Sequence, residues 1–163
     1  MPKDEAQALG NFVVAFAHLE QAMADFFACL INDPAGEIAG PVWASQNSNR
    51  ARHRLMKTVL EEHRLAKDID SEADHLLSQF SRLIDRRNEY IHGLWQTEID
   101  KDQIYLTPRI RANGDHWDFQ PVREVAHAEI AKAVGEIDTL HFSARRWRNR
   151  WLSDKSVEIA DLD

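Results

Sequence analysis

A chain of 163 residues with 44% hydrophobic and 29% charged residues has the composition of one globular domain and not of a disordered segment. Its net charge of −7 argues against a protein that coats long nucleic acid, because such proteins are usually basic. The N-terminus carries no basic leader, and no stretch reaches the roughly 18 uninterrupted apolar residues of a membrane span, so we expect a soluble, cytoplasmic protein.

Apolar residues at three- and four-residue spacing predict helices in the first part of the chain. The first helix runs from residue 5 to about 31 and ends at residues 33–36, where a proline and a glycine follow each other closely. A loop around Gly40-Pro41 comes next, and a second helix is predicted from about 47 to 67. The third helix begins near Asp70 and continues to about Leu94.

The hydrophobic period then changes from that of a helix to that of a strand. Apolar and polar residues alternate from Trp95 onward, residues 100–102 form a turn, and Asn113-Gly114 is a sequence typical of a tight hairpin. We predict a small three-stranded antiparallel meander over residues 95–120. A long helix opens at Pro121, a favourable first-turn position for proline.

These elements predict a mainly α fold, in which four helices form a bundle and the meander is inserted before the last long helix. We expect a single domain over residues 1–152. Residues 153–163 are acidic and are predicted to be a flexible tail.

Two charged residues interrupt the apolar faces of the predicted helices. Arg87 falls within about 20° of the midline of the apolar face of the third helix, and Glu20 lies in the apolar stripe of the first. An unpaired buried charge costs several kcal/mol. We therefore predict that Glu20 pairs with Arg87; the alternative is that Arg87 lines a cleft or an interface.

A second polar group follows Arg87 on the same helix. Asn88 and His92 are four residues apart and share one side of the helix. A straight helix separates Arg87 from His92 by about 140°. The two side chains meet only through the length of the arginine, through unwinding near Gly93, or across a symmetric dimer.

The segment Arg87-Asn88-Glu89-Tyr90-Ile91-His92 resembles the signature of the HEPN superfamily, in which an arginine and a following polar residue precede a histidine by a few residues. With Gly93 and a strand after it, the segment also resembles an uncharacterised bacterial branch. Many proteins with this signature are metal-independent ribonucleases that act as dimers, often in toxin–antitoxin or defence systems. Others are noncatalytic binding modules.

This resemblance implies an HEPN-like helical bundle, a homodimer, and a ribonuclease site formed by Arg87, Asn88 and His92. His92 would act as general base or acid, Arg87 would stabilise the phosphate charge, and Asn88 would orient the groups. Glu20 is inferred from the helix pattern and not from the motif. RNA and an antitoxin protein are the partners implied; the alternative function is a noncatalytic scaffold of unknown partner.

Four arginines near the end of the last helix are a candidate RNA-binding group. In the alternative interpretation they complement the dipole at the helix end, while Trp147 and Trp151 continue the buried stripe. The four are Arg145, Arg146, Arg148 and Arg150.

No other motif indicates chemistry. The eight histidines form no metal-binding pattern and the chain has no glycine-rich phosphate loop, so we expect neither a metal nor a cofactor. The single cysteine, Cys29, excludes an intrachain disulfide and fits a reducing compartment. We interpret it as a core residue, with a catalytic thiol as the alternative.

Overall fold

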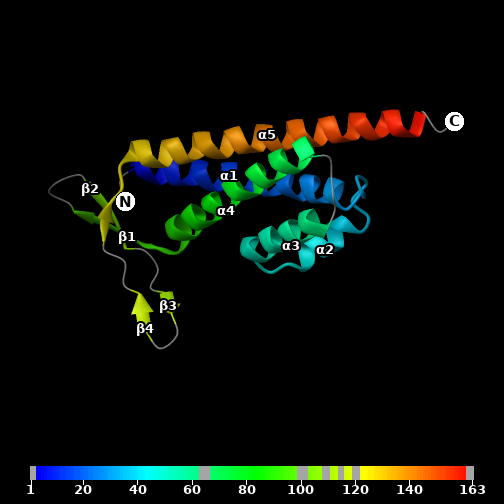
Figure 1. Cartoon of the computed structure of the whole chain (residues 1–163). Helices are drawn as coiled ribbons and strands as arrows, with labels where there is room; N and C mark the ends of the chain where they lie inside the picture. Colours follow the sequence, from blue (N-terminus) through cyan, green and yellow to red (C-terminus); the bar gives the residue numbers. More distant parts are fainter. Residues whose placement is uncertain are drawn as a thin grey trace. The chain divides into compact units, whose positions relative to one another are not determined.

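The computed structural model describes residues 3–62, 67–98, 103–107, 111–113, 116–118 and 122–160 (Figure 1). These residues form five α-helices and five short β-strands, which confirms the mainly helical fold with a small antiparallel sheet before the last long helix. The elements are α1 (Lys3–Leu30), α2 (Ala39–Ser45), α3 (Asn49–Glu62), α4 (Lys67–His92), β1 (Leu94–Glu98), β2 (Gln103–Thr107), β3 (Arg111–Asn113), β4 (His116–Asp118), β5 (Arg123–Glu124) and α5 (His127–Ala160).

The chain divides into two compact units, and each of them is discontinuous in sequence. Unit 1 consists of Met1–Phe16 and Leu83–Ile137, and unit 2 consists of Ala17–Arg82 and Asp138–Asp163. The helices α1, α4 and α5 therefore each contribute one segment to both units, whereas all strands belong to unit 1.

In unit 1, aromatic rings pack where α1 meets the end of α4. The rings of Phe12 and Tyr90 contact edge to face with centroids 5.0 Å apart. Strand β2 adds Ile104 and Leu106, which are buried and alternate with half-buried residues, as expected for a strand with one face on a core.

The predicted meander has a different third strand. Strands β1 and β2 are antiparallel, with Leu94 opposite Thr107, but the other neighbour of β2 is β5. Strands β3 and β4 form a separate two-stranded hairpin. The predicted turn at 100–102 lies outside the described residues, as do Gly114 and Pro121.

The predicted start of the last helix is wrong, because residues 123–124 pair with β2 as strand β5 and α5 begins only at His127. Pairing with the open edge of β2 satisfies backbone groups that the first turn of a helix would leave without partners. At its other end α5 continues to Ala160 and so includes residues 153–160 of the segment whose sequence predicts a flexible tail; residues 161–163 lie outside the described residues.

In unit 2, the predicted loop around Gly40-Pro41 contains the short helix α2. Asp33 stabilises its beginning, because one carboxylate oxygen accepts hydrogen bonds from the backbone N–H groups of Ile38 (2.8 Å) and Ala39 (2.7 Å). The bond from Ala39 is the main reason that the pKa of Asp33 lies below its usual value. The core of this unit includes Phe26 against Trp147, with ring centroids 4.5 Å apart.

Among the described residues, α1 is the one helix whose length and apolar composition would by themselves allow it to cross a membrane. Half of that stretch is buried inside the protein. Its buried residues recur at helical spacing, so α1 has the pattern of a core helix, which is compatible with a soluble protein. They include Phe12, Phe16, Leu19, Met23, Phe26 and Phe27.

Candidate functional site

The motif residues gather at the C-terminal end of α4, in unit 1. Nη1 of Arg87 lies 3.1 Å from Nε2 of His92 and 3.3 Å from Oδ1 of Asn88. Arg87 and Asn88 are half-buried, and His92 is exposed. The length of the arginine side chain therefore bridges the angular separation along the helix within one chain.

The contact with Arg87 determines which role the Nε2 atom of His92 takes in the hydrogen bond. A guanidinium has only N–H donors, so the Nε2 atom that faces it must carry a lone pair. Nε2 is therefore the acceptor of this hydrogen bond, which corresponds to the tautomer with its proton on Nδ1. The guanidinium of Arg87, a cation of the kind that binds phosphate, thus contacts the Nε2 atom of His92, which is capable of proton transfer. In this arrangement each of the two groups is already engaged by the other.

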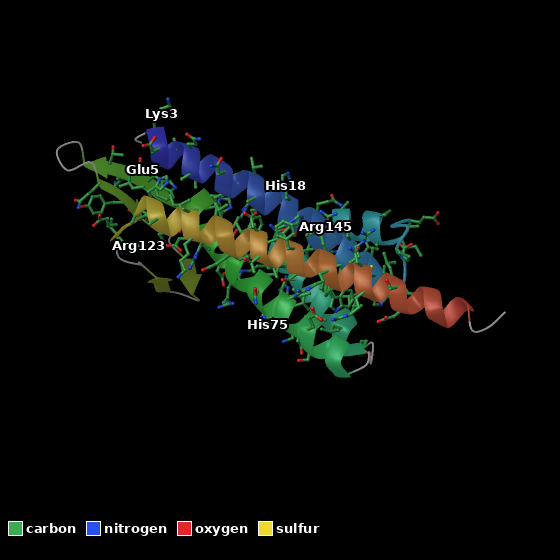
Figure 2. The ribbon with its side chains drawn as sticks, turned by 90° about the horizontal axis from the view of Figure 1, so that it is seen from above. Lys3, Glu5, His18, His75, Arg123 and Arg145 are labelled. Carbon is green, nitrogen blue, oxygen red and sulfur yellow. The ribbon has the colours of Figure 1, made fainter. Side chains whose placement is uncertain are left out.

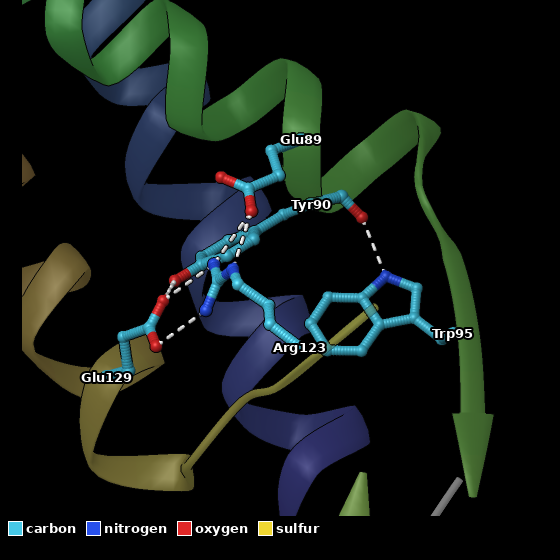
Figure 3. A network of polar contacts seen from close by, with 5 residues as sticks. All are labelled: Glu89, Tyr90, Trp95, Arg123 and Glu129. Carbon is cyan, nitrogen blue, oxygen red and sulfur yellow. Dashed lines mark hydrogen bonds and ion pairs between the residues drawn. The ribbon is translucent and has the colours of Figure 1, made fainter. Parts of the chain in front are cut away.

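The end of α4 holds His92 at a fixed place. The N–H of Gly93 donates to the carbonyl of Glu89 (2.9 Å), and the indole N–H of Trp95 donates to the carbonyl of Tyr90 (2.8 Å; Figure 3). A Cβ atom on Gly93 would lie 2.6 Å from that Glu89 oxygen and 3.1 Å from the carbonyl oxygen of Thr107. The helix can stop here against β2 only because residue 93 has no side chain.

Behind the motif lies an ionic network that the sequence analysis did not predict (Figure 3). Arg123 donates from Nε to Glu89 (2.8 Å), and its two Nη atoms donate to both oxygens of Glu129 at 2.8 and 2.9 Å. The hydroxyl of Tyr90 also donates to Glu129, at 2.8 Å. This network ties β5 and the first turn of α5 to the turn of α4 that carries the motif.

The network perturbs the acidity of its members. Burial raises the pKa of Tyr90, and the hydrogen bond to Glu129 raises it further. Burial alone would also raise the pKa of Glu129, but the hydrogen bonds from Arg123 and Tyr90 outweigh it and lower that pKa. Glu89 lies within the motif, so the sequence offered a signal for including it in the site. Arg123 had no such signal, because its segment is predicted to belong to the last helix.

The predicted partner of Glu20 is replaced by another arginine. Glu20 lies 3.4 Å from Nη1 of Arg52 on α3, and that guanidinium stacks on Trp43 with its carbon 5.1 Å from the ring centroid. Arg87 contacts its own helix instead. The helical pattern identified the two charges correctly as interruptions of apolar stripes, but it could not identify the element that packs against each one.

The four arginines of the predicted RNA-binding group separate into different environments. Arg150 pairs with Glu72, and Arg148 is half-buried and lines a hollow in unit 2. Arg145 and Arg146 are exposed, and Arg145 can be followed on α5 in Figure 2. Arg145 and Arg146 are therefore the two arginines of the group that face solvent without an ion pair among the described residues. The four arginines do not form a continuous row of exposed cations.

Cys29 is confirmed as a core residue. It is 1% exposed, and burial raises the pKa of its thiol to about 11, which keeps it protonated at neutral pH. Among the described residues, no three histidine, cysteine, aspartate or glutamate side chains form a group that could hold a metal ion.

We compared the chain with known protein families, curated proteins and solved structures. No protein family, no curated protein and no solved structure matches this chain.

Proposed function

We propose that the chain is a cytoplasmic endoribonuclease of the HEPN type, which cleaves RNA without a metal ion through Arg87, Asn88 and His92. The observation that supports this most directly is the 3.1 Å contact between Nη1 of Arg87 and Nε2 of His92. It places a fixed cation and a titratable nitrogen within the width of one phosphate group, which is the minimum set for attack by a neighbouring hydroxyl.

The reaction would begin when an RNA phosphate draws Arg87 away from His92. Charge-assisted hydrogen bonds to a phosphate are stronger than the bond to a neutral imidazole. Nε2 of His92 is then released to accept the proton of the 2′-hydroxyl, whose oxygen attacks the adjacent phosphorus. The bond from phosphorus to the 5′-oxygen breaks, which leaves a 2′,3′-cyclic phosphate and a 5′-hydroxyl after that oxygen gains a proton.

The leaving oxygen needs an acid, and His92 of one chain has already been used as the base. A homodimer would supply a second His92 across its two-fold axis. Exposed apolar side chains flank His92 in sequence: Ile91 is 37% and Leu94 is 61% exposed. Burial of these two residues against a second copy is the arrangement that we expect.

The runner-up is a noncatalytic module that binds RNA or a protein. Two observations favour it: Arg87 and His92 already satisfy each other, and the net charge of −7 gives weak attraction for a polyanion.

A cleavage assay with purified protein and single-stranded RNA in excess EDTA distinguishes the nuclease from the noncatalytic binding module. A nuclease should leave 2′,3′-cyclic phosphate ends and spare DNA of the same sequence. His92→Ala and Arg87→Ala should abolish cleavage, while His18→Ala and Arg86→Ala should not; circular dichroism verifies that all four variants are folded. Arg86 is a matched control, because it is half-buried next to Arg87 but pairs with Glu136 at 3.3 Å.

Two outcomes would reject the nuclease. RNA left intact by the wild type between about pH 5 and 8, the range in which histidine changes charge, would leave only the binding module. Equal cleavage by the wild type and by His92→Ala would show that the activity belongs to a contaminant.

A further inference from the structure

Unit 2 contains a hollow of about 330 Å³ that the proposed nuclease does not use. Its walls come from α1, from the turn before α2, from α2 itself, and from α5. This volume lies near the lower end of the range found for ligand pockets, so any occupant is small.

The hollow exists because small residues line it where larger ones would fill it. Ala24 and Ala28 are one turn apart on α1, and Ala39 and Gly40 are at the start of α2. Trp43 closes one side; its ring also contacts Phe27 at 5.9 Å between centroids, which holds the wall in place. The apolar part of the site is therefore preformed.

Two opposite charges line the same hollow without pairing. Arg148 is half-buried and, within the part of the chain that the structure describes, makes no hydrogen bond or ion pair. Asp25 uses one carboxylate oxygen to accept a hydrogen bond from Gln21 at 3.1 Å, and its second oxygen has no partner among the described residues. Both charges act on the buried thiol of Cys29, with opposite signs, so both reach the same neighbourhood.

We propose that this hollow binds a small zwitterion of the α-amino acid type. Its carboxylate would lie on Arg148, its ammonium group on Asp25, and its short apolar side chain against the alanines and Trp43. An unpaired half-buried guanidinium gains free energy from an anion. A simple carboxylate or a phosphate would meet repulsion from Asp25 and would bring no cation to it, so neither satisfies both charges.

The test is a titration of the full chain, observed by two-dimensional nitrogen–proton NMR, with L-valine as the probe. The indole N–H of Trp43 and the backbone amides of Ala24 and Ala39 should shift and saturate. Acetate and methylamine each carry only one of the two charges and should bind at least tenfold more weakly. Arg148→Gln and Asp25→Asn should each weaken valine binding at least tenfold.

Arg146→Gln is the matched control, because Arg146 is exposed on the same helix and does not line the hollow; its affinity for valine should equal that of the wild type. Arg148→Lys keeps the charge but loses the planar fork, so it should bind with intermediate affinity. Absence of saturation by valine up to about 10 mM, roughly tenfold above a dissociation constant of 1 mM, would overturn the proposal. Unchanged affinity in Arg148→Gln, or acetate binding as tightly as valine, would also overturn it.

Discussion

Arg87 donates a hydrogen bond from Nη1 to Nε2 of His92 at 3.1 Å, although the two residues lie on different sides of the same helix. The same Nη1 atom lies 3.3 Å from Oδ1 of Asn88, so one nitrogen joins all three residues of the motif. The cluster is held together inside a single chain. A dimer is then needed only for a second proton-transfer group and not for the meeting of Arg87 with His92.

This contact predicts the tautomer of His92. In the wild type, the neutral ring should carry its proton on Nδ1, because Nε2 accepts from Arg87. Arg87→Ala removes that donor, and the population with the proton on Nε2 should rise. Long-range nitrogen–proton NMR of the histidine rings measures both forms directly.

Arg86→Ala is the control for this measurement, since Arg86 binds Glu136 and not His92. It should leave the tautomer of His92 as in the wild type. An identical tautomer in Arg87→Ala and in the wild type would mean that the contact does not persist in solution.

Gly93→Ala should lower the free energy of unfolding by about 1–3 kcal/mol, the usual cost of overpacking. The added Cβ would meet the carbonyl oxygens of Glu89 and Thr107 at 2.6 and 3.1 Å, as well as the side chain of Leu106. Backbone atoms cannot move aside as the end of a flexible side chain can. Urea denaturation measures the change.

Gly135→Ala makes the same substitution within α5, where an added Cβ meets nothing within 4 Å. It should instead raise the free energy of unfolding by about 0.5–1 kcal/mol, because alanine is the better helix former. A Gly93→Ala variant that is as stable as Gly135→Ala would show that helix propensity, and not the close approach of β2, governs residue 93.

Hydrophobic spacing predicted the limits of α1 and α4 well, because each helix buries one continuous face. The predicted limits of the first helix, 5 to about 31, differ from those of α1 by two residues or fewer at each end. Helix α2 was missed because it has seven residues and depends on the carboxylate of Asp33. Strand β5 was missed because two residues carry no period of their own, and the edge of β2 determines their conformation.

The candidate site divides in the same way. Arg87, Asn88 and His92 are close in sequence, so the resemblance to the motif was sufficient to group them, although a helical wheel places Arg87 and His92 about 140° apart. Contacts that join distant elements, such as Arg123 to Glu129, depend on how the chain packs and have no local signal.

Glu129→Gln should change the response of the protein to acid. The folded-state pKa of Glu129 is lowered from its ordinary value of 4.5, so its charged form contributes stability above about pH 4.5, and that contribution is lost as the pH falls through the lowered pKa. The variant should lose about 1–2 kcal/mol at pH 7. Its deficit relative to the wild type should shrink as the pH falls below 4.5.

Glu124→Gln provides the control, since Glu124 is an exposed carboxylate on β5. Its unfolding free energy should follow that of the wild type at every pH. A deficit of Glu129→Gln that stays constant from pH 7 to about pH 3 would show that the ionised carboxylate adds nothing beyond its shape.

Double-mutant cycles can measure whether Glu20 is coupled to Arg52, its partner in the structure, or to Arg87, the partner predicted from the sequence. The contact is 3.4 Å long and its side chains are 22% and 30% exposed, so water screens it and the coupling energy with Arg52 should be about 0.2–1 kcal/mol. Glu20→Ala and Arg52→Ala, alone and combined, measure this coupling by urea denaturation. Glu20→Ala combined with Arg87→Ala should be additive within about 0.5 kcal/mol, because these two residues have different partners. A coupling of several kcal/mol between Glu20 and Arg87 would instead support the buried ion pair predicted from the helical pattern. It would also contradict the assignment of Arg87 to the site around His92.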